Sequence, residues 1–252
     1  MTLRKYFVAL LATAAWLVFG GAASAAFPNY SDCPRTTPGM TFCIDIQGIR
    51  GNLRIKEFNV PLGESLEIRG GLIQREDDSL TFVPPRGTNG FFARSVRVPG
   101  GLLGIEWLPG NEVLAITELA GPASAIRLNT EDLTISLPIK VRLVNFLLGM
   151  NCHIGTDTNP VRLNLIADTT SPPAPNRPIT GSHGEVRPVS PTEIRILNAV
   201  NVENSFSIPD SSSCGIGLGL INAIVDLRLG LPSAAGNNEI QVTNNIGIQA
   251  VI

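Results

Sequence analysis

The side chains best suited to chemistry in this chain are four cysteines, Cys33, Cys43, Cys152 and Cys214. The sequence contains no Cys-x-x-Cys pair, and its Cys–His spacings fit neither a zinc ribbon nor a zinc finger. An even number of cysteines in an exported chain is typical of disulfides. Four cysteines allow three pairings, of which we favour Cys33–Cys43 and Cys152–Cys214.

Each favoured pair would close a loop that is otherwise poorly constrained. Cys33–Cys43 closes a short segment containing Pro34, Pro38 and Gly39, and Cys152–Cys214 encloses the most proline-rich part of the chain. On the chain-entropy model the two bridges would stabilise the fold by about 3 and 4 kcal/mol.

The two histidines, His153 and His183, offer little for acid–base chemistry. His183 follows Ser182, but adjacent side chains rarely face each other as a nucleophile and base must. No Gly-x-Ser-x-Gly motif occurs. We expect His183 to lie in a loop and His153 to have a packing or surface role, and we predict no metal and no cofactor.

Two segments with carboxylate side chains are candidate sites. Glu106 precedes Trp107, which could stack on a sugar, but few other large aromatic side chains accompany it. We expect Trp107 to be a core residue beside a surface glutamate. The run Glu76-Asp77-Asp78 is expected to cap a hairpin turn, because it lacks the ligand spacing of a calcium loop.

The N-terminus reads as a secretory signal peptide. Basic Arg4 and Lys5 precede the apolar segment 6–19, and Ala23-Ser24-Ala25 offers a small-x-small cleavage site. We predict a signal peptide at 1–25 and a secreted domain at 26–252. The alternative is an uncleaved anchor, although the apolar segment is short for a bilayer span. No later segment approaches a membrane helix, so the mature chain is expected to be secreted or noncovalently associated with the cell envelope.

Composition restricts the function classes further. The 252-residue chain has a net charge of −2, and removing Arg4 and Lys5 reduces its 19 basic residues to 17 against 21 acidic, a net charge of −4. A chain with 44% hydrophobic residues is not disordered. The acidic balance also gives no basic surface for nucleic acid, so no nucleic-acid partner is expected.

Most of the chain has the period-two pattern of β-strands. Apolar residues alternate with polar ones at 133–143, at 161–165 and at 240–252. Pro138 interrupts the polar phase of the first, which favours an edge strand or a bend. A turn at Gly51-Asn52 is expected to separate two further strands. The weaker strand candidates are 42–49, 53–60, 64–73, 79–84, 92–98, 112–118, 124–129 and 193–202.

These patterns predict a mainly β protein, built as an antiparallel β-sandwich or barrel-like domain. One short helix is expected near 216–228, where Ile221, Ile224 and Val225 have helical spacing. The proline-rich segment 171–191 is expected to be a surface loop. It could divide two domains, but a Cys152–Cys214 bridge across it favours a loop held on one body.

Several motifs occur in a fixed order in the second half. They are Glu118-Leu-Ala-Gly-Pro-Ala-Ser124, Leu137-Pro-Ile-Lys-Val-Arg-Leu143, Cys152-His-Ile-Gly155, Asn159-Pro-Val-Arg-Leu-Asn-Leu165, Ser171-Pro-Pro-Ala-Pro-Asn-Arg-Pro-Ile-Thr-Gly181, Cys214-Gly215 and Leu229-Gly-Leu-Pro-Ser-Ala-Ala-Gly236. Over roughly 118–238 the chain resembles a family of uncharacterised secreted proteins of actinomycetes. The resemblance implies export from a Gram-positive cell and supplies no activity. His153 stands where relatives tend to have an aromatic residue, which argues against a chemical role.

The sequence therefore favours a noncatalytic secreted or cell-envelope β-domain over an enzyme. Its partner would be an apolar ligand, a polymer or a protein, such as a cell-envelope component. One alternative is a secreted hydrolase with an unrecognised site. The other is an outer-envelope β-barrel, which the alternating strands favour but the missing Trp and Tyr girdles oppose.

Overall fold

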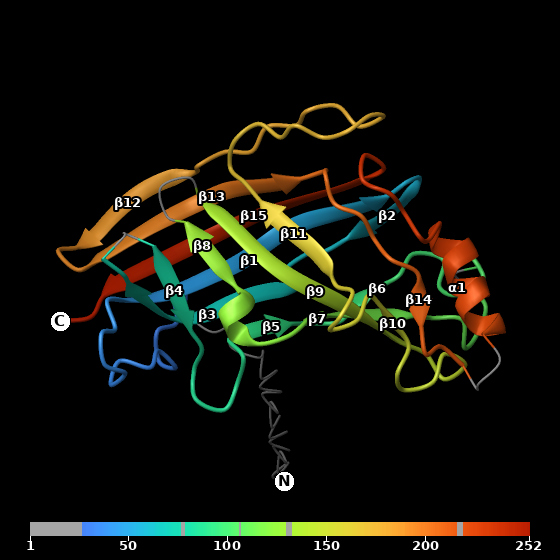
Figure 1. Cartoon of the computed structure of the whole chain (residues 1–252), viewed down its shortest axis with the longest axis horizontal. Helices are drawn as coiled ribbons and strands as arrows, with labels where there is room; N and C mark the ends of the chain where they lie inside the picture. Colours follow the sequence, from blue (N-terminus) through green and yellow to red (C-terminus); the bar gives the residue numbers. More distant parts are fainter. Residues whose placement is uncertain (1–26, 77–78, 106, 130–132, 216–218) are drawn as a thin grey trace, which may run out of the picture.

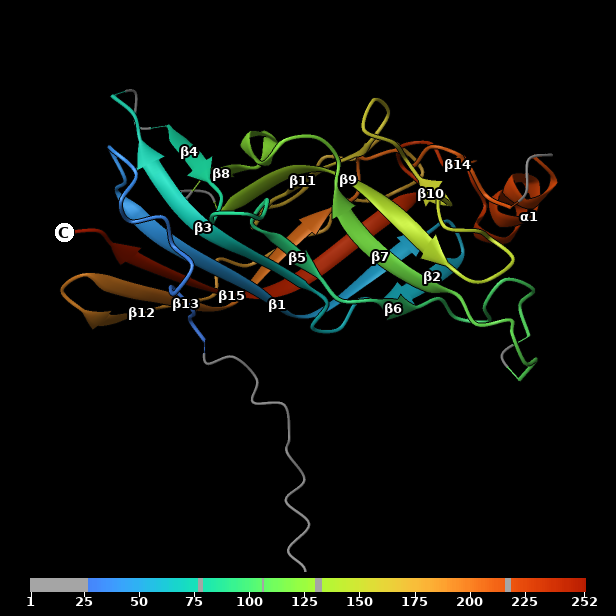
Figure 2. The ribbon, with the colours of Figure 1, turned by 90° about the horizontal axis from the view of Figure 1, so that it is seen from below.

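The computed structural model describes residues 27–252, apart from 77–78, 106, 130–132 and 216–218. Two antiparallel sheets face each other, with one short helix at one end (Figures 1 and 2). The predicted mainly β, sandwich-like architecture is confirmed. The predicted signal peptide at 1–25, Asp77 and Asp78 of the acidic run, and Glu106 lie outside the described residues.

The first sheet has eight strands in the order β12-β13-β15-β1-β3-β4, with β2 paired to β1 and β5 paired to β3. Its strands are β1 (Phe42–Ile55), β2 (Phe58–Pro61), β3 (Leu66–Gln74), β4 (Leu80–Val83), β5 (Phe91–Ala93), β12 (Glu185–Ser190), β13 (Glu193–Glu203) and β15 (Asn238–Ala250).

The second sheet has seven strands in the order β14-β10-β9-β7-β6, with β8 and β11 also paired to β9. Its strands are β6 (Val96–Arg97), β7 (Leu114–Leu119), β8 (Arg127–Asn129), β9 (Thr134–Val144), β10 (His153–Ile154), β11 (Val161–Leu165) and β14 (Ser211–Ser212). A 3₁₀ turn, η1 (Ala123–Ala125), lies between β7 and β8, and α1 (Leu220–Leu229) precedes β15.

Strand β1 is continuous through the position where a turn was expected. It pairs with β15 along almost its whole length, and the register shifts by one residue between Gly48 and Arg50. A bulge of this kind moves the inward phase from even to odd residues. Ile46 is buried before the bulge and Ile55 after it. The predicted break at Gly51-Asn52 is therefore wrong, because the pattern changed phase without the strand ending.

Strand β9 lies in the centre of its sheet and shows the predicted alternation. The expectation of an edge strand at Pro138 is wrong. The Pro138 carbonyl accepts a hydrogen bond from Ala120, so its missing N–H faces the same side. On that side the pairing of β7 with β9 ends at Ile139, and the pairing of β8 with β9 begins at Ser136. The proline thus occupies the gap between two partners.

The helix forms as predicted, although the first residues of the expected range, 216–218, lie outside the described residues. The proline-rich loop is shorter than expected, because its last residues, 185–190, form β12. Pro188 lies opposite Ile194 in an exposed edge strand, where a missing donor is tolerated. The Asn176 side chain donates to the Asn204 and Asn238 carbonyls, which fixes the loop to β15 and to the end of β13.

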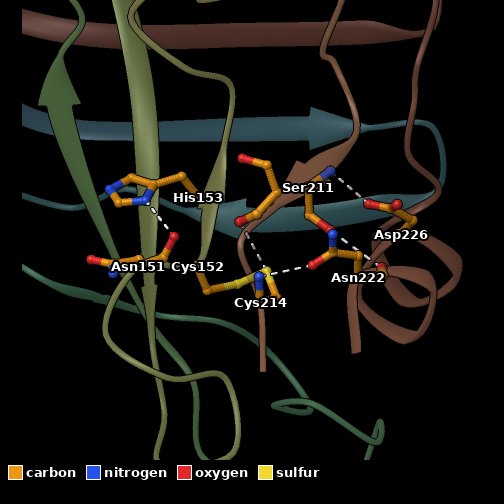
Figure 3. Close-up of a disulfide and its surroundings, with 8 residues drawn as sticks. Asn151, Cys152, His153, Ser211, Cys214, Asn222 and Asp226 are labelled. Atoms are coloured by element: carbon orange, nitrogen blue, oxygen red, sulfur yellow. Dashed lines mark hydrogen bonds between the residues drawn. A yellow bond between two sulfur atoms is a disulfide. The ribbon is translucent and has the colours of Figure 1, made fainter. Parts of the chain in front are cut away.

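Both favoured disulfides are present, and the described residues contain no free cysteine. Cys33–Cys43 joins the N-terminal segment to the start of β1. Cys152–Cys214 joins the segment before β10 to the segment that leads into α1 (Figure 3). The Cys214 N–H donates to the Asn222 side chain at 2.8 Å, so the bridge also positions the helix.

Removing the second bridge should destabilise the end of the sandwich that carries α1. We expect Cys152→Ser with Cys214→Ser to lower the melting temperature by about 10 °C, because a loop of 62 residues is released in the unfolded chain. Calorimetry measures the shift, and non-reducing peptide mapping should still find Cys33 joined to Cys43. An unchanged melting temperature would contradict this role of the bridge.

Candidate functional site

Two adjoining apolar cavities lie between the sheets, each with a volume of about 70 Å³. Seven residues line both cavities, so together they form one elongated space. The shared residues are Leu53, Leu62, Thr117, Ile139, Val141, Leu163 and Ile240. They come from both sheets, so the space lies in the middle of the sandwich.

The long axis of this inter-sheet space follows the strands. One cavity reaches Phe91 and Ile68, on β5 and β3. The other reaches Phe206, Ile208 and Leu229, beside the last turn of α1. The space therefore extends toward the end of the molecule at which the helix lies (Figure 1).

Few polar residues line the space. Thr117 lines both cavities, and Glu67 and Asn244 line only the one nearer β3. Glu67 forms a 3.0 Å ion pair with Arg69, and the Asn244 amide donates to Asn201 at 2.9 Å, so both have other partners. The lining can contact an apolar chain by dispersion and burial, and it supplies no nucleophile paired with a base.

The sandwich is joined along one side. Ile166, just after β11, exchanges two backbone hydrogen bonds with Val202 of β13, at 3.0 and 2.8 Å. These bonds connect the two sheets directly. On this side the main chain bridges the two sheets at Ile166 and Val202.

The opposite side contains a seam between β2 and β6–β7. Among the described strands, β2 pairs only with β1, and β6 pairs only with β7. Residues lining the space here are partly exposed, including Leu62 on one side and Val96, Ala115 and Thr117 on the other. The seam is where a ligand could reach the inter-sheet space without breaking strand pairing.

Arg228 lies at the helix end of this seam. Its guanidinium lies 4.8 Å from the centre of the Phe58 ring and donates to the Pro99 carbonyl at 3.0 Å. Phe58 belongs to β2 and Pro99 follows β6, so one side chain from α1 contacts both borders of the seam.

The histidines do not form a hydrolase site with the residues around them. His183 Nε2 lies 3.8 Å from Asp168, and both side chains are largely exposed. The adjacent Ser182 hydroxyl accepts a hydrogen bond from the Gly184 N–H. His153 lies on the outer face of the second sheet, 3.5 Å from Glu118, with its Nδ1 next to the Asn151 carbonyl (Figure 3). Among the described residues no group of metal-binding side chains occurs.

Trp107 lies on the surface, so its predicted position in the core is wrong. It was expected in the core, but its side chain is 81% exposed in the loop between β6 and β7. The fixed polar contacts of this loop explain the outward position. Asn111 is buried and its amide donates to the Gly100 and Ile105 carbonyls, so the loop is folded around an asparagine.

Asp45, which no sequence motif marked as a site, is a fully buried carboxylate on the outer face of β1. The Asn29 N–H donates to one oxygen at 2.6 Å, and no described group hydrogen-bonds the other. Burial raises the pKa of Asp45 to about 6, and nearby Glu67 adds to the rise. The sequence offered one signal for this burial. Asp45 lies on the same strand face as Cys43, and the Cys33–Cys43 disulfide brings the N-terminal segment over that face.

The raised pKa predicts that ionised Asp45 costs stability. Between about pH 4 and 6 the folded protein retains the Asp45 proton while the unfolded chain releases it, so stability falls as pH rises through this window. Asp45→Asn removes the effect. We expect the variant to gain up to about 3 kcal/mol relative to wild type between pH 4 and 7, measured by urea unfolding. If the free energies of unfolding of wild type and Asp45→Asn changed in parallel with pH, this role for Asp45 would be ruled out.

No protein-family model, curated protein or solved structure matches the chain. No helix among the described residues is long and apolar enough to cross a membrane. The two disulfides indicate folding in an oxidising compartment outside the cytoplasm.

Proposed function

We propose that this protein is a noncatalytic, exported binding protein that holds an elongated apolar molecule, such as an acyl chain, between its two sheets. The observation that carries the proposal is the pair of adjoining cavities, which share seven lining residues and have almost wholly aliphatic walls. Pockets that bind small molecules are concave and mainly apolar, with few polar groups.

The cavities are costly if they serve no ligand. Unfilled volume in a core costs about 24 cal/mol per Å³, so each cavity of about 70 Å³ costs about 2 kcal/mol. An apolar chain in this space would recover the lost dispersion contacts and remain shielded from water. This argument favours a binding role over a purely structural one.

The shape of the space favours a chain over a compact ring system. It runs from Phe91 near one end of β3 to Leu229 at α1, and its middle is lined by consecutive inward residues of β7, β9 and β11. The partly exposed residues at the seam offer the way in. A ligand longer than the present cavities would enter by separating β2 from β6–β7, which share no ladder.

Export is part of the proposal. The basic residues, apolar segment and Ala23-Ser24-Ala25 of the N-terminus support a signal peptide cleaved after Ala25. The ordered motifs over 118–238 support kinship with the uncharacterised secreted proteins of actinomycetes. An extracellular or envelope-associated protein with an apolar interior would be suited to hold cell-envelope lipid.

The inter-sheet space can be tested by filling it. Thr117→Phe places a ring where both cavities meet, and Ile116→Phe places the same ring on the other face of β7 as a matched control. We expect wild type and Ile116→Phe to bind a fluorescent long-chain fatty acid, and Thr117→Phe to weaken binding at least about tenfold. Fluorescence titration measures the affinities.

Folding must be monitored in the same samples, because a ring in the core can overpack it. The circular dichroism spectrum of Thr117→Phe should remain that of a β protein. A smaller substitution, Ala115→Val, fills only the cavity near α1 and should weaken binding less. Failure of the wild-type protein to bind, or equal binding by folded Thr117→Phe, would refute the proposal.

A further inference from the structure

Exposed apolar side chains gather at one end of the sandwich. Eight of the twelve large apolar side chains that are exposed among the described residues belong to three neighbouring segments, the loops 99–111 and 145–151 and helix α1. We call these eight the apolar tip. They are Leu103, Ile105, Trp107, Phe146, Leu147, Met150, Leu220 and Leu227.

The three segments form one surface. The Asn145 amide donates to the Gly110 and Glu112 carbonyls at 2.9 and 2.7 Å, which joins the two loops. The Gly215 N–H donates to the Leu148 carbonyl at 2.8 Å, which joins the second loop to the segment before α1. Figure 2 shows both loops and the helix at the end of the molecule opposite the C-terminus.

The tip side chains are held outward by a folded scaffold. Trp107, Met150 and Leu227 are 81%, 88% and 87% exposed. Buried residues anchor the same loops from below, because Leu148 is fully buried and Asn111 is almost so. A preformed apolar surface of this kind loses little conformational freedom when it is covered.

The distribution of charge around the tip favours one kind of partner. Apart from Glu106, the segments 99–111, 145–152 and 213–224 contain no charged residue. The nearest charges on α1 are engaged inside the protein, since Asp226 accepts the Ser211 N–H at 2.8 Å and Arg228 contacts Phe58 and the Pro99 carbonyl. A protein partner would be expected to match a polar rim, whereas a lipid surface requires only apolar anchors with an interfacial indole.

We propose that the apolar tip docks this protein onto a lipid surface, with Trp107, Phe146 and Met150 inserted at the headgroup boundary. The cavity that ends at Leu229 and Phe206 lies on the inner side of α1, so docking would bring the candidate binding space close to a source of apolar chains. The inference rests on the tip residues alone and does not need the proposed function.

Trp107 can report the docking directly. In the chain that begins at Ala26, after the proposed cleavage, Trp107 is the only tryptophan. We expect its emission to shift to shorter wavelength on addition of phosphatidylcholine vesicles, and brominated lipids to quench it. Because phosphatidylcholine has no net charge and Glu106 is the one charged residue of the tip segments, the lipid concentration for half-maximal quenching should change little with salt.

Matched double variants separate the tip from exposed apolar residues elsewhere. Phe146→Ser with Met150→Ser should raise the lipid concentration for half-maximal quenching at least about tenfold. Val186→Ser with Ile194→Ser removes two exposed apolar side chains of β12–β13 and should leave it within about twofold. All variants begin at Ala26, the first residue after the proposed cleavage, so the apolar segment 6–19 cannot itself bind the vesicles.

Three results would overturn the inference. They are an unshifted Trp107 emission in vesicles, equal quenching of the two double variants, and an emission shift on concentrating the protein without lipid, which would assign the tip to self-association. Thr117→Phe is expected to dock normally. Loss of fatty-acid binding with intact docking therefore concerns the inter-sheet space, and the converse concerns the tip.

Discussion

The hydrogen-bonded ladder between β1 and β15 is the interaction on which the rest of the fold depends. It joins the N-terminal and C-terminal parts of the described chain, and it remains paired across the bulge at Gly48. On its other edge β1 pairs with β3 before the bulge and with β2 after it. Because β2 has no further strand partner among the described residues, this change of partner is what leaves the seam beside β6–β7.

The bulges in the first sheet coincide with buried polar side chains. Asn244 of β15 lies opposite both register shifts, one in β1 and one in β13, and its side chain donates to Asn201. Asn201 in turn donates to the Leu133 carbonyl, just before β9 in the other sheet. Buried amide groups need hydrogen-bond partners, so these bonds fix the position of one sheet relative to the other at the bulges. Asn244 also lines the cavity nearer β3, so the apolar space extends along the strands past this bulge.

The same inward residues therefore act as core and as candidate site. Ile139 and Leu163 are buried and stabilise the sandwich, while they also line both cavities. Small inward side chains at Ala115 and Thr117 leave the volume that larger ones would fill. The buried carboxylate of Asp45 lies outside this space, under the N-terminal segment on the outer face of the first sheet.

Sequence reasoning succeeded where a pattern is local. The alternation in 133–143 and 161–165 predicted β9 and β11, and loop composition predicted both disulfide pairs. It failed where tertiary contacts decide. Gly51-Asn52 looked like a turn because these residue types are typical of turns, but β1 continues through them after its bulge. Pro188 suggested a loop, although an edge strand tolerates it.

The site was harder to predict than the fold. No sequence motif marks a cavity, because the lining residues are ordinary strand residues. The cavity is the volume that their side chains leave unfilled. Trp107 was placed in the core because large aromatic residues are usually well buried. Its outward position depends on Asn111, Asn145 and the approach of α1, which are long-range contacts that no local pattern encodes.

The most direct test of an apolar-chain binding protein is native mass spectrometry of protein purified without detergent and incubated with a lipid extract of cell envelopes. The inter-sheet binding site predicts a complex heavier than the polypeptide by the mass of one acyl-chain lipid, and predicts that Thr117→Phe lacks this complex while Ile116→Phe retains it. Detection of the bare polypeptide alone, as purified and after incubation, would contradict it.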